Sequence, residues 1–255
     1  MILALDMGNT NIVIGCIDAS KTYFVERVTT DHAKTGTEYA INIKNILEIH
    51  QIDPSQIEGA IMSSVVPPLN AAISSAVKKI LGYHPMLVGA GIKTGMNIIM
   101  DNPKTVGSDM IVDAVAAIHE YPGPIIIIDM GTATTMSVVD KNGNYIGGII
   151  YPGLRVSLDS LSSKTAQLPS ISLDIPKRII GKNTIDCMRS GIMYGNAGMI
   201  DGILDHMEAE LGEPATIIAT GGLSRFVVPL CRHKILYDDA LLLKGLMILY
   251  EKNKA

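Results

Sequence analysis

The stretch I-I-I-I-D-M-G-T-A-T-T at Ile125–Thr135 decides the fold. Its four consecutive isoleucines follow Pro122-Gly123-Pro124 and run up to Asp129, a pattern typical of a strand buried on both faces. In the turn that follows, Gly131 lets the backbone approach a ligand closely, and the threonines add hydroxyls beside exposed N–H groups. Such a turn suits phosphate and a metal ion, but a single copy is equally well explained by an ordinary turn at the end of a strand.

The same pattern occurs a second time, at the N-terminus. Ile2-Leu3-Ala4-Leu5 ends at Asp6-Met7-Gly8-Asn9-Thr10, and a second apolar run, Ile12-Val13-Ile14, follows. The copy around Asp129 also continues into an apolar run, which ends at an Asn142-Gly143 pair that favours a tight hairpin. Each copy therefore predicts a strand, a phosphate-sized turn and a second strand. Two copies predict a duplicated architecture that holds a nucleotide between its halves.

Alternating strand and helix patterns fill the rest of the chain and predict an α/β protein. Besides the hairpins we expect strands at 23–28, 59–66, 85–88 and 216–219, and helices at 37–50, 69–81, 108–118, 154–163, 185–211 and 241–250. Thr37, followed by Glu38, is the expected cap of the first helix. Residues 89–109 contain several glycines and show no periodicity, so we expect a long loop, which inside a compact domain is usually functional.

Composition and charge exclude several classes of protein. The chain has 255 residues, of which 47% are apolar, enough for a packed core in one large or two modest domains. Its net charge is −4 and it has no block of Lys or Arg, so neither nucleic acid nor an anionic membrane is an expected partner. Residues 1–17 are largely apolar, but Asp6 and Asn9 interrupt them well below the length of a membrane span, which predicts a strand and not a signal.

The cysteines and histidines predict neither a disulfide framework nor a structural zinc site. Cys16, Cys187 and Cys231 are widely spaced and odd in number, so we interpret them as small core residues of a cytoplasmic protein. The six histidines show no paired ligand spacing and have no neighbouring cysteine or glutamate suited to a metal.

A series of motifs, in this order and spacing, resembles the type III pantothenate kinase family within the acetate kinase/sugar kinase/heat-shock/actin superfamily. The motifs are D-M-G-N-T at 6–10, S-S-V-V-P-P at 63–68, G-I-K-T-G at 91–95, D-N-P at 101–103, V-G-S-D at 106–109, D-M-G-T-A-T-T at 129–135, G-G-I-I-Y-P-G at 147–153, A-Q-L-P at 166–169, G-K-N-T at 181–184 and A-T-G-G-L at 219–223. The likeness runs the full length of the chain.

The resemblance implies a fold and an activity. The fold is two ribonuclease H-like lobes, with mixed sheets flanked by helices and the nucleotide in the cleft between them. We place the N-terminal lobe at 1–120 and the C-terminal lobe at 121–255. The implied activity is the ATP-dependent phosphorylation of pantothenate to 4'-phosphopantothenate, the first step of coenzyme A biosynthesis.

The resemblance also implies ATP contacts at both hairpins. The residues that match the family's ATP and phosphate site are Asp6, Met7, Gly8, Asn9, Thr10, Asn11, Ile12, Val13 and Thr132. Asp6 is expected to organise Mg²⁺, through water. Asp129 is expected to hold the monovalent cation, K⁺ or NH₄⁺, that the family uses.

Asp109 matches the family's catalytic aspartate, the general base for the pantothenate hydroxyl. On local sequence alone, an acid at the start of a helix is more often a cap or a partner of the helix dipole. The expected substrate-binding residues are Met100, Gly107, Ser108, Asp109, Met110 and Thr184. Thr184 is expected to be presented across a homodimer interface, although simple N-capping of the helix at 185–211 also explains it.

The helix expected at 185–211 contains Gly191, Gly195, Gly198 and Gly202. Each glycine inside a helix costs about 1 kcal/mol relative to alanine, so four of them at intervals of three or four suggest a face that packs closely on another backbone. A partner helix in a homodimer would provide that surface.

Two substrate-site positions depart from the family pattern. Met100 stands where the family commonly has tyrosine, and Met110 where it has arginine, whose charged fork a thioether does not replace. Compensation by another basic group is open, with Arg155, Lys164 and Lys182 as the candidates. A non-catalytic nucleotide-binding or regulatory relative, and a kinase for another small hydroxylated acceptor, therefore remain alternative functions.

Overall fold

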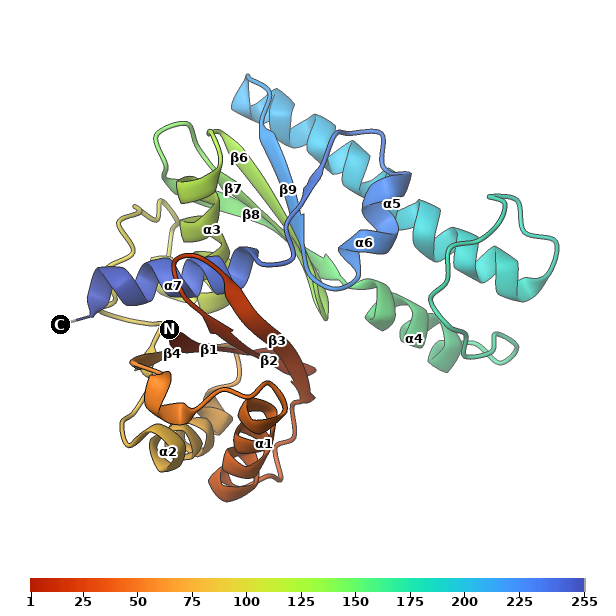
Figure 1. The fold of residues 1–255 in the computed structure, drawn as a ribbon. Helices are drawn as coiled ribbons and strands as arrows, with labels where there is room; N and C mark the ends of the chain where they lie inside the picture. Colours follow the sequence, from red (N-terminus) through yellow and green to blue (C-terminus); the bar gives the residue numbers. More distant parts are fainter. Residues whose placement is uncertain (255) are drawn as a thin grey trace. The chain divides into compact units, whose positions relative to one another are not determined.

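The computed structural model describes residues 1–254, and this chain divides into two compact units (Figure 1). The first unit contains residues 1–95, 101–116 and the C-terminal segment that begins at Leu241. The second contains residues 96–100 and 117–240. The chain crosses from the first unit to the second between residues 116 and 117, whereas the sequence placed the boundary between the lobes at 120/121. The C-terminal segment groups with the first unit. The reason is that its helix buries Leu243, Leu246 and Leu249 in the same apolar cluster as Ile2 of the first strand.

The first unit is built on a mixed sheet with the order β3-β2-β1-β4-β5. Its strands are β1 (Ile2–Met7), β2 (Asn11–Ile17), β3 (Thr22–Thr29), β4 (Gly59–Ser64) and β5 (Met86–Leu87). The first three strands form an antiparallel meander, and β4 and β5 continue the sheet in parallel with β1. The predicted N-terminal hairpin is therefore β1 and β2.

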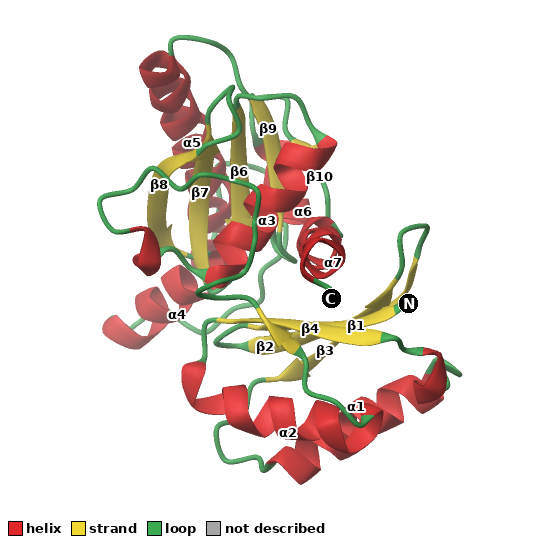
Figure 2. Ribbon diagram, turned by 90° about the vertical axis from the view of Figure 1, so that its left-hand side faces the viewer, coloured by secondary structure: helices red, strands yellow, loops and turns green. Residues whose placement is uncertain are grey.

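Helices cover both faces of this sheet, as Figure 2 shows. Helices α1 (Gly36–Ile49) and α2 (Asn70–Leu81) cover one face, where Leu3, Leu5 and Met7 are buried. The other face, with Ile2 and Ala4, packs on α7 (Leu241–Asn253) and on the start of α3 (Ser108–Glu120). Both faces of β1 are thus buried, as its unbroken apolar run predicted.

The cap of α1 differs from the one predicted. Its N-cap is Thr35, whose hydroxyl accepts the Glu38 N–H at 3.3 Å while the Glu38 carboxylate accepts the Thr35 N–H at 2.7 Å. This reciprocal arrangement is a capping box, which satisfies two backbone donors at once. Thr37, the predicted cap, lies inside the helix and accepts a hydrogen bond from Lys79 Nζ.

The second unit repeats the sheet of the first. Its strands are β6 (Ile125–Met130), β7 (Ala133–Val139), β8 (Tyr145–Pro152), β9 (Thr216–Thr220) and β10 (Leu236–Tyr237). Their order, read from the other edge, is β8-β7-β6-β9-β10, which matches β3-β2-β1-β4-β5 strand for strand. The β6/β7 and β7/β8 pairs are antiparallel, and β9 is parallel to β6. The prediction of an α/β protein with a duplicated hairpin architecture is confirmed.

Helices also pack on the second sheet. They are α4 (Leu154–Lys164), α5 (Thr184–Leu211) and α6 (Ser224–Val227), which is followed by a short 3-10 turn at Val228–Leu230. The first unit has short 3-10 turns at Pro54–Gln56, Pro67–Leu69 and Pro103–Thr105. Ile126 and Ile128 of β6 share a buried cluster with Ile200 and Leu204 of α5. Of the helices between residues 1 and 254, none has the length and apolar character needed to cross a membrane.

The prediction that all three cysteines are core residues is wrong for one of them. Cys16 is buried and Cys231 is partly buried, but Cys187 is exposed. Cys187 lies near the start of α5, where it projects from the helix next to Gly181, and its Sγ contacts the Gly181 carbonyl at 3.5 Å.

Candidate active site

In the first unit, the turn between β1 and β2 has its backbone fixed while its side chains face solvent. Gly8 N–H donates to the Asn11 carbonyl at 3.1 Å, and Thr30, at the end of β3, donates its hydroxyl to the Gly8 carbonyl at 2.6 Å. The Thr30 N–H also donates to the Thr10 carbonyl at 3.0 Å. Asn9 and Thr10 are exposed. Sequence analysis missed Thr30, because it lies 22 positions from Gly8 in the chain.

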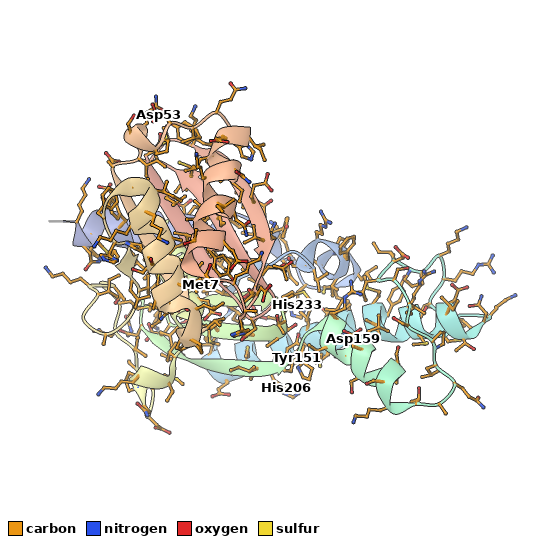
Figure 3. The ribbon with its side chains drawn as sticks, turned by 90° about the horizontal axis from the view of Figure 1, so that it is seen from below. Met7, Asp53, Tyr151, Asp159, His206 and His233 are labelled. Atoms are coloured by element: carbon orange, nitrogen blue, oxygen red, sulfur yellow. The ribbon has the colours of Figure 1, made fainter. Side chains whose placement is uncertain are left out.

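The residues expected to bind ATP in this hairpin fall into two groups. Met7 (labelled in Figure 3) and Ile12 are fully buried, so only their backbone atoms remain for a ligand. Asn9, Thr10 and Asn11 have exposed side chains, and Gly8 and Val13 are partly exposed. Asp6 is partly exposed and lies opposite Val13 on β2 and Ser63 on β4.

Asp109 lies in the first turn of α3, in the same unit as Asp6. Burial raises the pKa of its carboxyl, and the hydrogen bond that Oδ1 accepts from the Met110 N–H, at 2.8 Å, opposes part of that rise. A Cβ on Gly107 would overlap Asp109 Oδ1, so glycine there leaves room for the carboxylate. A buried carboxylate with a raised pKa is a stronger proton acceptor once ionised than an ordinary aspartate.

The predicted substrate-binding residues are spread over both units. Gly107, Ser108 and Met110 precede or begin α3 in the first unit and are partly exposed. Met100 belongs to the second unit, with its Sδ 3.7 Å from where a Cβ on Gly147 would lie. Residues 97–99 are held there because Ile99 N–H donates to the Tyr145 carbonyl and Tyr145 N–H to the Asn97 carbonyl, both at 2.8 Å.

Thr184 is the first residue of α5 and is exposed. The N-cap of this helix is Asn183, whose side chain accepts the Asp186 N–H at 2.9 Å. The capping role that sequence alone left open for Thr184 is therefore filled by its neighbour.

In the second unit, the hairpin turn is crowded by two glycines. Gly131 N–H donates to the Ala133 carbonyl at 3.0 Å, and Gly153, the N-cap of α4, donates to the Thr132 carbonyl at 3.1 Å. A Cβ on Gly153 would overlap the carbonyls of both Gly131 and Thr132. A Cβ on Gly221, just after β9, would lie 2.6 Å from Asp129 Oδ1. The two glycines thus bring backbone against the turn and the Asp129 carboxylate.

Each of the two carboxylates lies near the end of a strand that leads into a turn. Asp6 is partly exposed and the following Asn9 and Thr10 are exposed, a setting that fits Mg²⁺ because that ion keeps several waters and binds proteins through one or two carboxylates. Asp129 leads into the turn at Gly131, where a Cβ on Gly131 would lie 3.9 Å from Asp129 Oδ2. Carboxylate and carbonyl oxygens are the ligands that such ions prefer.

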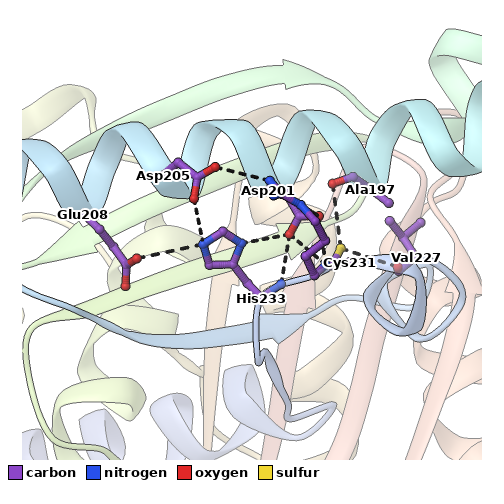
Figure 4. Close-up of polar contacts among 8 residues, drawn as sticks. Ala197, Asp201, Asp205, Glu208, Val227, Cys231 and His233 are labelled. Carbon is purple, nitrogen blue, oxygen red and sulfur yellow. Dashed lines mark hydrogen bonds and ion pairs between the residues drawn. The ribbon is translucent and has the colours of Figure 1, made fainter.

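A polar cluster around His233 lies outside both hairpins (Figure 4). His233 Nδ1 lies 2.9 Å from Asp201 Oδ1, and Nε2 lies 3.2 Å from Asp205 and 3.9 Å from Glu208. The buried Asp201 carboxylate also accepts the N–H groups of Arg232 and His233, and hydrogen bonds from these donors lower its pKa against the effect of burial. The cluster joins the segment before β10 to α5. Sequence analysis missed it because only the tertiary fold brings His233 to this helix.

The fold, with two sheets of the same strand order and a carboxylate and a glycine-containing turn in each hairpin, is shared with other two-sheet α/β proteins of known structure. The activator of 2-hydroxyisocaproyl-CoA dehydratase from Clostridium difficile, solved with bound ADPNP, is similar in fold, with a TM-score of 0.58, 14% identity and coverage of 98% of this chain and 93% of that one. The ROK hexokinase from Thermus thermophilus has a TM-score of 0.53, 11% identity and coverage of 99% of both chains.

Sequence comparison identifies the family within this class. The family model described as type III pantothenate kinase matches residues 2–206. The type III pantothenate kinase of an Exiguobacterium species is 44% identical over 254 residues, which is 100% of both chains. That of Moorella thermoacetica is 42% identical over 253 residues, 99% of this chain and 100% of its own. The chain belongs to the type III pantothenate kinase family.

Proposed function

We propose that this protein transfers the γ-phosphoryl group of ATP to the hydroxyl of pantothenate, giving 4'-phosphopantothenate for coenzyme A biosynthesis, with Asp109 as the general base. Membership of the family supports the reaction. The observation that supports the base is the partly buried Asp109 carboxylate, whose pKa is raised by desolvation and whose place is kept open by Gly107. Asp109 would accept the hydroxyl proton as the oxygen attacks phosphorus.

The phosphates would be bound by the backbone and side chains of the first hairpin, from Asp6 to Val13, and by Thr132 in the second unit. Phosphoryl transfer depends mainly on positioning and on neutralising charge. Mg²⁺ supplies positive charge to the phosphates, and Asp6 would orient it through water. The exposed Asn9 and Thr10, on a turn fixed by Thr30, support this assignment.

A monovalent cation, K⁺ or NH₄⁺, would be held by Asp129. The support is the partly exposed Asp129 carboxylate near the end of β6, against which the glycine-containing turns at Gly131 and Gly221 pack. Activity should then depend on K⁺, and Asp129→Asn should weaken that dependence together with the affinity for ATP. Equal activity in Na⁺ and in K⁺ would contradict the assignment of a monovalent-cation site to Asp129.

A homodimer is supported by the open face of α5. A Cβ on any of Gly191, Gly195, Gly198 and Gly202 would meet no heavy atom within 4 Å. These glycines therefore do not serve packing within the described chain, and a second copy would use them, with Thr184 presented to the partner's substrate. Light scattering of the wild type and of Gly195→Leu tests this proposal, which predicts a dimer for the first and a monomer for the second. The cytoplasmic location stays a prediction.

One coupled assay tests the activity itself. Turnover is measured with ATP, Mg²⁺, K⁺ and pantothenate, and ADP formation is linked to NADH oxidation. Enzymic turnover with pantothenate is expected. If pantothenate is not turned over but another small hydroxylated acceptor is, Met100 and Met110 redirect the enzyme to that acceptor. Neither alternative that these methionines left open is favoured by the fold or by the family.

A further inference from the structure

The Ser108 hydroxyl, next to the proposed base, is engaged entirely within the protein. It accepts the Ser64 N–H at 3.0 Å, donates to the Ser64 carbonyl at 3.0 Å and lies 2.9 Å from the Ser63 hydroxyl. A hydroxyl has one proton and two lone pairs. With its proton on the Ser64 carbonyl, Ser108 accepts from Ser64 N–H and from Ser63 O–H, and no capacity is left for a substrate.

Ser63 provides the side-chain partner of the Ser108 hydroxyl, whereas Ser64 provides backbone partners. It lies at the carboxyl end of β4, is 0% exposed, and is 45 positions from Ser108 in the sequence. In the parallel pairing of β1 with β4 it is opposite Asp6, so both side chains project from the same face of the sheet. That face is the one that α3 covers. The Ser63–Ser108 bond therefore ties the start of α3 to the strand end beside Asp6.

We propose that Ser63 is a positioning residue of the kinase, which places the Asp109 carboxylate relative to Asp6 through its hydrogen bond to Ser108. Ser63 touches no reacting atom in this arrangement. The neighbouring Ser64 contributes by orienting the same hydroxyl with its backbone, while its own Oγ donates to Asn70 Oδ1 at 2.6 Å. The inference rests on the proposed role of Asp109 as the base.

The test compares steady-state kinetics of Ser63→Ala, Ser108→Ala and the double variant. Ser63→Ala loses one neutral hydrogen bond and should lower kcat about threefold to tenfold, with KM for ATP and pantothenate changed less than about twofold. Ser108→Ala also loses the two bonds to the Ser64 backbone and should lower kcat at least as much. The acid limb of the kcat profile should move to lower pH, because a less confined carboxylate is better solvated and its pKa falls. Since Ser63 acts only through the Ser108 hydroxyl, the double variant should lose little more activity than Ser108→Ala alone.

Two controls separate positioning from a general effect on folding. Ser63→Thr keeps the hydroxyl and should keep most of the activity. A threonine, Thr220, stands at the equivalent strand end of the second unit. Ser137→Ala removes another buried serine hydroxyl, which lies 3.2 Å from the Tyr145 hydroxyl, and should leave kcat unchanged. If Ser63→Ala does not fold, Ser108→Ala, at a partly exposed site, carries the same kinetic test.

Asp109→Asn serves as the reference. If it is inactive while the serine variants keep wild-type kcat and pH profile, or lose activity additively, the positioning role is wrong and the base assignment stands. If Asp109→Asn itself turns over normally, the proposed function of Asp109 is wrong, irrespective of the serine results.

Discussion

Asp6 in the first unit and Asp129 in the second occupy equivalent places in equivalent sheets. Each is the fifth residue of a strand with the same pattern of burial, and each has a hydroxyl residue opposite it on the parallel neighbour, Ser63 for Asp6 and Thr220 for Asp129. The next residue along that neighbour differs. It is Ser64 in the first unit and Gly221 in the second.

This difference accompanies a different contact at each strand end. In the first unit, Ser63 and Ser64 bind the Ser108 hydroxyl at the start of α3, the helix that carries Asp109. In the second unit, Gly221 turns with φ +86° and brings backbone against Asp129. The two sheets thus end their equivalent strands at the same place, but a helix start is hydrogen-bonded to the parallel neighbour in the first unit, and a glycine turn packs on the carboxylate in the second.

The largest expected effect tests the assignment of the base to the first unit. Asp109→Asn should lower kcat by about 10²-fold or more with KM for ATP largely unchanged, because a positioned base is lost and phosphate binding is not. The matched change in the second unit, Asp129→Asn, should instead weaken the dependence of activity on K⁺ and raise KM for ATP. Steady-state kinetics of both variants decide this, and the same pattern in the two variants would contradict different roles for the two units.

Asp109→Asn should also stabilise the protein near neutral pH. The pKa of Asp109 is raised in the folded state, so the folded protein binds this proton more tightly than the unfolded chain does. The stability contribution of the group is therefore largest at low pH and falls as pH rises through the unfolded and then the folded pKa. Urea unfolding of wild type and variant at pH 4 and pH 7 checks it: the advantage of the variant should grow with pH.

Gly221→Ala should destabilise the second unit through both a steric overlap and a strained backbone. Its Cβ would lie 2.6 Å from Asp129 Oδ1 and 2.8 Å from the backbone N of Met130, and φ is +86°. Overpacking costs about 1–3 kcal/mol and a left-handed alanine adds about 1 kcal/mol. Gly212→Ala is the matched control, since φ is +74° there and a Cβ would meet nothing within 4 Å.

Urea unfolding of both glycine variants separates the two causes. Gly212→Ala should lose only the backbone term, about 1 kcal/mol. Equal losses for the two would show that the space beside Asp129 is not restricted.

Met110→Arg tests the departure of the first unit from its family. Without compensation a charge-assisted bond to the pantothenate carboxylate is missing, and such a bond contributes roughly 1.5–3 kcal/mol. The variant should lower KM for pantothenate by about 10-fold or more while KM for ATP hardly changes. An unchanged or higher KM for pantothenate would mean that another group already receives the carboxylate.

The smallest effect concerns the start of a helix in each unit. Thr35→Ala removes the capping box of α1 and should cost about 1 kcal/mol in the free energy of unfolding, whereas Thr37→Ala, in the exposed interior of that helix, should cost less than about 0.5 kcal/mol. In the second unit α4 starts at Gly153 without a side-chain cap. Thermal unfolding of the two threonine variants measures the difference, and equal losses would place the cap at Thr37.

The sequence alone determined the duplicated hairpins, the α/β class and the family. These properties follow from local patterns: an unbroken Ile125–Ile128 run requires a strand covered on both faces, and the turn residues after Asp6 and Asp129 close each hairpin. The residues expected to bind phosphate were inferred from their place in these motifs, and their role stays a prediction. Most of the helices and strands were likewise found within a few residues of their observed bounds.

Only the tertiary structure decided which distant residues support these turns. The Ser63–Ser108 bond, the packing of Gly221 on Asp129 and the addition of α7 to the first unit each join segments far apart in the chain. Periodicity reports the face on which a side chain lies, but not which segment covers that face. Buried hydroxyls and crowded glycines obtain their roles from that covering segment, and for this reason no local pattern revealed them.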